Sequence, residues 1–210
     1  MIDEKTLEQL RERAAEGCHG RPPAHDFLHV SRVAALARTI AMAEGARVDV
    51  VVAAATLHEL VNLPKSHPES HRSGDLCAEE AARVLAEVGV EGALAAAVVT
   101  CIRDHAFSKG ARPESLEVAV LQDSDRLDAI GAIGIARCFA TCSEMERPFY
   151  SPDDPFCRTR APDDKSFGLD HFYRKLLRIE EGLHTATARA LGRERAEFLR
   201  TYLRQLEREI

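Results

Sequence analysis

The stretch VVVAAATLHEL, residues 50–60, decides the fold class. Its first eight residues are apolar except for Thr56, and ionisable side chains enter only at His58 and Glu59. A helix that is apolar nearly all round is buried at the centre of a domain. We therefore expect a central helix over residues 49–60, with two potential metal ligands at its end.

The sequence on both sides of this run also predicts helices. Apolar residues recur with the period of an amphipathic helix, and glycines and prolines separate the periodic segments. Ala, Leu, Glu and Arg dominate, no Trp occurs, and no strong strand alternation is seen, which together favour helix over strand. The expected helices cover residues 3–15, 24–44, 49–60, 76–88, 92–105, 114–143, 167–191 and 193–208.

The length of 210 residues suits one large domain. We predict an all-α protein whose residues 1–210 form a single-domain helical bundle. Its core spans about residues 20–145, and the C-terminal helices, about residues 167–210, pack on that core.

Charge and cysteine content exclude several classes of protein. The formal net charge of −6 gives no basic footprint for nucleic acid and argues against an anionic membrane surface. The longest apolar run is too short to span a bilayer, and the first residues show no secretory signal pattern. The six cysteines form no CxxC pair, so we expect them to be reduced and mostly buried, which indicates a cytoplasmic protein. The sequence does not determine the oligomeric state, and a homo-oligomer is compatible with it.

Four groups of potential metal ligands lie inside or at the ends of the expected helices, at residues 25–29, 58–59, 105 and 123–128. Such polar side chains near a core cost free energy unless they are paired or bind a cation. Two imidazoles and two carboxylates suit Mn, Mg, Fe, Co, Ni or Zn rather than a thiolate-selective metal. We therefore expect one buried site for a divalent metal ion, built from several helices.

Simpler explanations exist for each group. A single histidine on a helix is usually a satisfied or exposed residue, and the acidic residues 123, 125 and 128 could form a solvated face. Their apolar neighbours Leu121, Leu127 and Ile130 argue against full exposure. A zinc-protease motif requires a second histidine four residues after His58, and position 62 is Asn, so that interpretation fails.

Three segments together resemble the HD-domain metal-dependent phosphohydrolases: HDFLHVSRV at residues 25–33, IRDHAF at 102–107 and QDSDRLDAIGAIGIAR at 122–137. The family pattern is a His, a His-Asp doublet and a distant Asp, all carried on helices. The resemblance covers roughly residues 20–160, and the last segment is the most specific. It implies an HD-type helical bundle and hydrolysis of a phosphate ester.

Carried over to this chain, the resemblance implies four metal ligands, His29, His58, Glu59 and Asp125. The chain departs from the family in the doublet, where His58-Glu59 replaces His-Asp. Glutamate keeps the carboxylate but is one methylene longer, and it can still bind a hard cation.

The resemblance also implies catalytic roles for Glu59, His105 and Lys65, and contacts to a phosphate from Lys65, His105 and Arg126. For Lys65 and Arg126, plain surface charge explains the residue equally well.

The expected function is metal-dependent hydrolysis of a nucleotide or a related small phosphorylated substrate. Metal-dependent oxygenase chemistry is a variant that His67, His71 and His105 leave open. The alternative class is a catalytically weakened ligand-binding or regulatory protein, suggested by Glu59. A partner-binding helical protein that uses the acidic residues 153–164 ranks last, because it leaves the buried His and carboxylate set unexplained.

Overall fold

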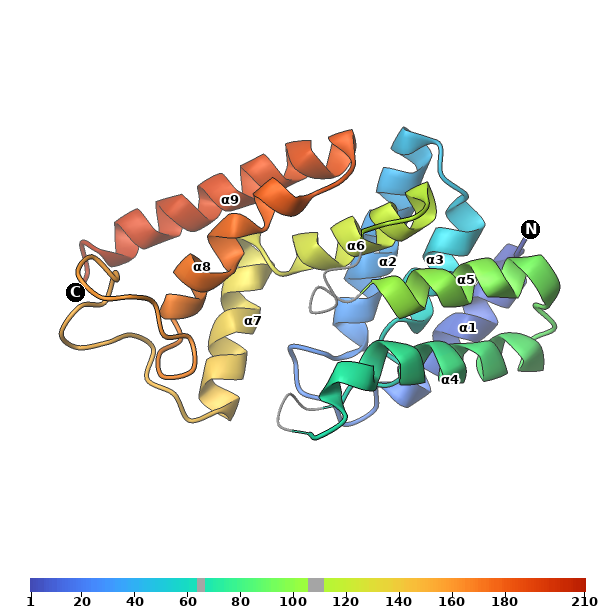
Figure 1. The fold of residues 1–210 in the computed structure, drawn as a ribbon, viewed down its shortest axis with the longest axis horizontal. Helices are drawn as coiled ribbons and strands as arrows, with labels where there is room; N and C mark the ends of the chain where they lie inside the picture. The colour runs from blue at the N-terminus through green and yellow to red at the C-terminus, as the bar shows by residue number, and fades with distance from the viewer. Residues whose placement is uncertain (64–66, 106–111) are drawn as a thin grey trace. The chain divides into compact units, whose positions relative to one another are not determined.

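The structure of the protein is a computed structural model that describes residues 1–63, 67–105 and 112–210. These ranges contain helices and turns and no strand, which confirms the all-α prediction (Figure 1). The chain divides into two compact units, residues 1–125 and 126–210, and the boundary falls within one helix. That these units form one domain stays a prediction.

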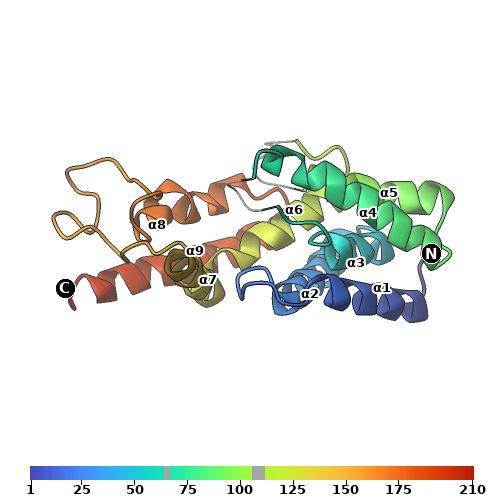
Figure 2. The ribbon, with the colours of Figure 1, turned by 90° about the horizontal axis from the view of Figure 1, so that it is seen from below.

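The first unit surrounds the helix that carries the apolar run 50–57. Its elements are α1 (Glu4–Gly17), α2 (Phe27–Glu44), α3 (Val48–Leu57), α4 (Ser73–Glu87), α5 (Gly92–Asp104) and most of α6 (Leu116–Asp128). Helix α3 packs against α1, α2 and α5, and α4 lies beside α5 (Figure 2). Every residue from Val50 to Leu57 is buried, which confirms the prediction of a central third helix.

The second unit contains the end of α6, α7 (Gly131–Glu144), α8 (Asp170–Arg174) and α9 (Ala186–Leu206). Helix α7 packs against α9. Phe139 is the centre of an aromatic cluster, with Phe149 at 5.1 Å, Phe172 at 6.0 Å and Tyr202 at 6.3 Å between ring centroids. Such ring pairs stabilise a small core beyond the area that they bury.

The prediction of one long helix over residues 114–143 is wrong, because the helix breaks between Asp128 and Gly131. Ile130 is extended, and Gly131 has φ of +78°, a conformation that favours glycine. Carbonyl groups at the end of α6 accept hydrogen bonds from outside that helix: Leu127 O from Arg195 at 2.6 Å, and Asp128 O from Arg137 at 3.2 Å. These bonds replace the ones that a continuous helix would make.

The two predicted C-terminal helices are also wrong in their bounds. Helix α8 ends at Arg174, short 3-10 turns follow, and Thr185 starts α9 by accepting a hydrogen bond from the Ala188 backbone. Gly192 lies inside α9 and is buried. A Cβ atom there would stand 2.4 Å from Leu183 Cδ1, so this glycine permits close packing and does not end a helix.

All six cysteines are free within the described residues, and five of them are buried, in agreement with the sequence prediction. Among the described helices, none combines the length and the hydropathy that a membrane span requires.

Candidate metal centre

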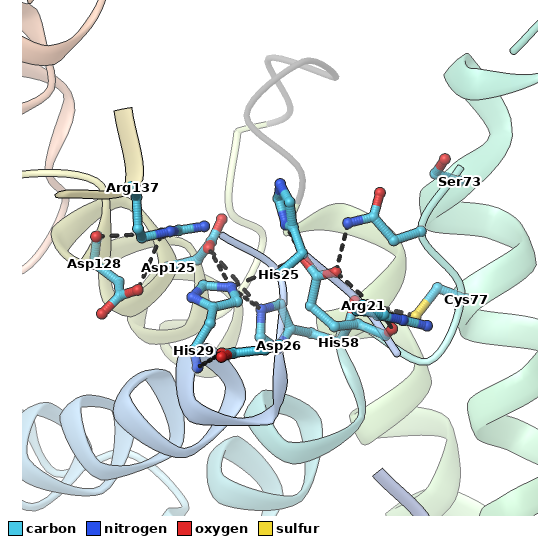
Figure 3. A network of polar contacts seen from close by, with 12 residues as sticks. Arg21, His25, Asp26, His29, His58, Ser73, Cys77, Asp125, Asp128 and Arg137 are labelled. Atoms are coloured by element: carbon cyan, nitrogen blue, oxygen red, sulfur yellow. Dashed lines mark hydrogen bonds and ion pairs between the residues drawn. The ribbon is translucent and has the colours of Figure 1, made fainter. Parts of the chain in front are cut away.

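Three helices of the first unit each supply one side chain to a common site. His29 lies in the first turn of α2, whose start is fixed by Asp26 accepting a 3.0 Å hydrogen bond from the His29 backbone. His58 follows the last residue of α3, and Asp125 lies near the end of α6. Figure 3 shows the three side chains pointing toward one another.

The distances among these side chains suit a metal ion. His29 Nε2 lies 3.3 Å from His58 Nε2 and 3.6 Å from Asp125 Oδ1, and His58 Nε2 lies 3.9 Å from the same Oδ1. Metal–ligand bonds of about 2.0–2.2 Å place neighbouring ligand atoms roughly 3–4 Å apart, depending on the angle between the bonds. Both histidines are buried and Asp125 is half-buried. The donor set and its geometry therefore fit a divalent cation held by His29, His58 and Asp125.

A backbone carbonyl fixes the tautomer of His58 that can bind a metal through Nε2. Its Nδ1 lies 2.7 Å from the carbonyl oxygen of Ala55, which can only accept, so Nδ1 carries the proton. The lone pair of Nε2 then faces the other two ligand atoms. Burial lowers the pKa of His58 to about 4, so the imidazole is neutral near pH 7 and ready to bind a cation.

Glu59 lies beside the three ligand atoms. Its Oε1 is 3.8 Å from His29 Nε2 and 3.4 Å from His25 Nδ1, while Oε2 accepts a 2.6 Å hydrogen bond from Asn62. Burial alone would raise the pKa of Glu59, but the contact with His25 and the nearby imidazoles of His58 and His29 hold it below its usual range. The carboxylate is therefore ionised at neutral pH.

The remaining predicted residues fall in several places. His105 lies against His58, with ring centroids 5.3 Å apart, and its Nδ1 contacts the carbonyl oxygen of Ile102.

Arg126 lies in the second unit, where it donates a 2.8 Å hydrogen bond to Gly182 O and contacts His184. Asp128 pairs with Arg137 at 3.0 Å. Lys65 lies outside the described residues, so its predicted role stays a prediction.

Sequence reasoning missed two residues that hold Glu59. Arg21 lies 3.5 Å from Glu59 Oε2 and also binds backbone carbonyls beyond α3. It stands in a Gly- and Pro-rich turn that carries no metal-ligand signal. In the sequence, Asn62 is notable only as the residue that breaks a zinc-protease motif, although a spacing of three residues places it within reach of Glu59.

The fold and this site define the class of protein: the chain belongs to the HD domain family, whose profile matches residues 27–130. YpgQ of Bacillus subtilis (strain 168) is 34% identical over 214 residues, which cover 100% of this chain and 96% of YpgQ. The crystal structure of YpgQ in complex with ADP covers 97% of each chain, with a TM-score of 0.76.

Two further solved structures are similar over nearly the whole chain. A protein from Lactobacillus plantarum is 30% identical and covers 100% of this chain and 98% of its own, with a TM-score of 0.80. An HD-superfamily hydrolase from Bacillus thuringiensis is 27% identical and covers 98% and 97%, with a TM-score of 0.76. Together with the His29, His58 and Asp125 cluster, these relationships support a metal-dependent hydrolase.

Proposed function

We propose that the protein is a metal-dependent phosphohydrolase that acts on a nucleotide or a related small phosphorylated metabolite. The observation that carries this proposal is the convergence of His29, His58 and Asp125 from three helices, with ligand atoms within 4.8 Å of one another. The nucleotide class is supported by the similarity to YpgQ, which has been crystallised with ADP.

A bound divalent ion would lower the pKa of a coordinated water and polarise a phosphoryl oxygen. The protein's own groups have separate tasks. His58 is held by Ala55 in the tautomer that directs its Nε2 lone pair toward the site. His25 contacts Glu59 and its side chain is 44% exposed, so its imidazole lies between that carboxylate and solvent.

Among the described residues, His105 is the proposed contact to the substrate. The Nδ1 atom of His105 is occupied by the Ile102 carbonyl, which leaves Nε2 to bind a phosphate oxygen. Lys65 is proposed to contribute positive charge to the transferring group, as the resemblance implied. Charge placed beside the phosphoryl oxygens stabilises the transition state more strongly than the bound substrate.

The test is a screen for phosphate release. Metal-free protein is supplied with Mn, Mg, Fe, Co, Ni or Zn ions and offered nucleoside mono-, di- and triphosphates and small sugar phosphates. We expect turnover that requires one or more of these ions and disappears in His29→Ala. Absence of turnover with every ion and substrate class would contradict the proposal.

A second candidate is a ligand-binding or regulatory protein that has lost turnover. The departure at Glu59 favours it, because Oε2 is engaged by Asn62 and Arg21, so only Oε1 faces the other ligands. Nucleotide binding measured by calorimetry, without metal and without turnover, would support this second candidate. Metal-dependent turnover would exclude it.

A further inference from the structure

We infer that Arg21 is a positioning residue that fixes the Glu59 carboxylate beside the metal centre. This inference rests on the proposed function, because it assigns Arg21 a part in building the same site. Arg21 lies in the turn between α1 and α2, whereas Glu59 follows α3, and 38 residues separate the two. Figure 3 shows Arg21 on one side of the group of histidines.

The guanidinium of Arg21 is held at several points. Nη1 donates to the Glu59 carbonyl oxygen, and Nη2 donates to the Leu60 carbonyl oxygen at 2.9 Å. These two bonds orient the planar guanidinium, since its donors have a fixed fork geometry. Nη1 then lies 3.5 Å from Oε2 of the Glu59 side chain. One arginine therefore contacts both the backbone and the carboxylate of the same residue.

These contacts give the two oxygens of Glu59 different surroundings. Oε2 has Asn62 at 2.6 Å and Arg21 at 3.5 Å. Oε1 faces the imidazoles, with His25 at 3.4 Å and His29 at 3.8 Å. A glutamate has one more rotatable bond than an aspartate, so its carboxylate needs more restraint to stay in place. Arg21 and Asn62 supply that restraint and leave Oε1 directed at the site.

The burial of this pair distinguishes it from the surface ion pairs of the same unit. The side chains of Arg21 and Glu59 are 18% and 12% exposed, whereas those of Arg13 and Glu87 are 48% and 54% exposed. Exposed pairs are screened by water and contribute little. Metal sites require their groups to be held within about 0.5 Å, and loss of an outer partner typically weakens metal binding 10- to 100-fold.

A purely structural role is the competing explanation, because Arg21 also braces the turn after α3 through two carbonyls. A double-mutant cycle separates the two roles. The variants are Arg21→Ala, Glu59→Gln and both together, with Arg13→Ala as the matched control. Affinity for Mn²⁺ is measured by titration calorimetry on metal-free protein without substrate. The melting temperature of each metal-free variant is recorded in parallel.

We expect Arg21→Ala to weaken Mn²⁺ binding by about tenfold or more. The double variant should bind no more weakly than Glu59→Gln alone, because Arg21 acts through that carboxylate. Asn62→Ala removes the other donor to Oε2, so it should also weaken Mn²⁺ binding. It should cause no further loss when it is combined with Glu59→Gln. Arg13→Ala should bind as the wild type does. Arg21→Lys keeps the positive charge but lacks the planar set of guanidinium donors. This variant should fold, and its Mn²⁺ affinity should lie between those of Arg21→Ala and the wild type.

Three results would overturn the inference. The first is an Mn²⁺ affinity of Arg21→Ala that equals that of the wild type. The second is a double variant whose loss of affinity equals the product of the losses in Arg21→Ala and Glu59→Gln. The third is a loss of affinity that occurs only in variants whose melting temperature is also lowered. If Arg21→Ala does not fold, Arg21→Lys and Asn62→Ala carry the same comparison. A wild type that binds no Mn²⁺ would refute both this inference and the metal premise of the proposed function. A wild type that binds Mn²⁺ without hydrolysing any phosphate ester would refute the proposed function alone.

Discussion

The Nε2 atoms of His29 and His58 lie 3.3 Å apart in the interior of the first unit, although 29 residues separate the two histidines in the sequence. The proton of His58 is on Nδ1, where it bonds to Ala55, so the Nε2 lone pair of His58 faces Nε2 of His29. Packing two such groups without solvent is costly unless they share a proton or a cation. Together with Asp125 the pair could hold a metal ion, and this cluster gives the first prediction.

Replacing His58 by alanine should abolish metal binding while the helices remain folded. One of the three converging donors is lost, and the core of α3 is formed by other residues, Val50 to Leu57. We expect the affinity for Mn²⁺ to fall by more than the roughly 10- to 100-fold that loss of an outer partner causes. Elemental analysis and circular dichroism provide the measurement. The exposed His19 is the control position, and full metal occupancy in His58→Ala would exclude His58 as a ligand.

The change Glu59→Asp restores the doublet of the family and tests how far this site has adapted to glutamate. Shortening the side chain by one methylene should withdraw the carboxylate from Asn62, now 2.6 Å from Oε2, and should alter where Oε1 stands. We expect lower turnover or a changed metal preference, because metal sites are sensitive to shifts of about 0.5 Å. Rates with each divalent ion provide the comparison, and Glu87→Asp is the control.

Two other outcomes of the same change have different meanings. A rise in turnover from near zero would indicate a decayed enzyme that the aspartate repairs. No change in metal content or in rate would contradict the expected role of Glu59 as a metal ligand.

The sequence predicted those parts of the fold and the site that depend on local pattern. The apolar run 50–57 places α3 at the centre of its unit. The pattern of His, Glu and Asp gave four candidate groups, and the family resemblance singled out His29, His58 and Asp125, which converge in the structure. Arg21 was missed because its partners lie 38 and 39 residues away, and no local pattern records such a contact.

Two of the errors in the second half of the chain involve glycine. The sequence pattern predicts Gly131 inside a long helix, whereas this residue adopts positive φ and begins a new helix. The pattern predicts a helix break at Gly192, whereas this residue lies inside α9 against Leu183. The same residue type permits a turn or a close approach, and only the tertiary partners decide between the two.

In the second unit, Asp170→Asn should lower the free energy of unfolding by about 3 kcal/mol. Asp170 is fully buried, and its carboxylate binds the Arg160 guanidinium and accepts a 2.6 Å hydrogen bond from the Asp163 backbone. The asparagine keeps the shape but leaves the arginine charge without its partner. Urea unfolding measures the change.

The control for this change is Arg158→Ala, which breaks an exposed ion pair with Glu207 in the same unit. It should alter the free energy of unfolding by less than about 1 kcal/mol. If the two substitutions change the free energy of unfolding equally, the buried pair contributes no more to stability than the exposed pair.

The metal-free protein should lose stability as the pH falls from 6.5 to 4, and His58 should cause part of that loss. Burial lowers the pKa of His58 from 6.5 to about 4 in the folded chain. Between these values the unfolded chain binds a proton that the folded chain does not, so acid favours unfolding. A shift of this size corresponds to up to about 3 kcal/mol. The lowered pKa of Glu59 acts in the same direction. The ionised carboxylate stabilises the folded chain above pH 4.5, and this stabilisation is lost as the pH falls below that value.

Urea unfolding of the chelator-treated protein at pH 7, 6 and 5 measures this dependence. His58→Gln removes the titrating group, so its free energy of unfolding should fall less between pH 7 and 5 than that of the wild type. His71→Gln, at an exposed position, should follow the wild-type slope. If the slopes of His58→Gln and the wild type coincide, then the imidazole of His58 is not buried in its neutral form, and the readiness of its Nε2 for a cation has to be explained in another way.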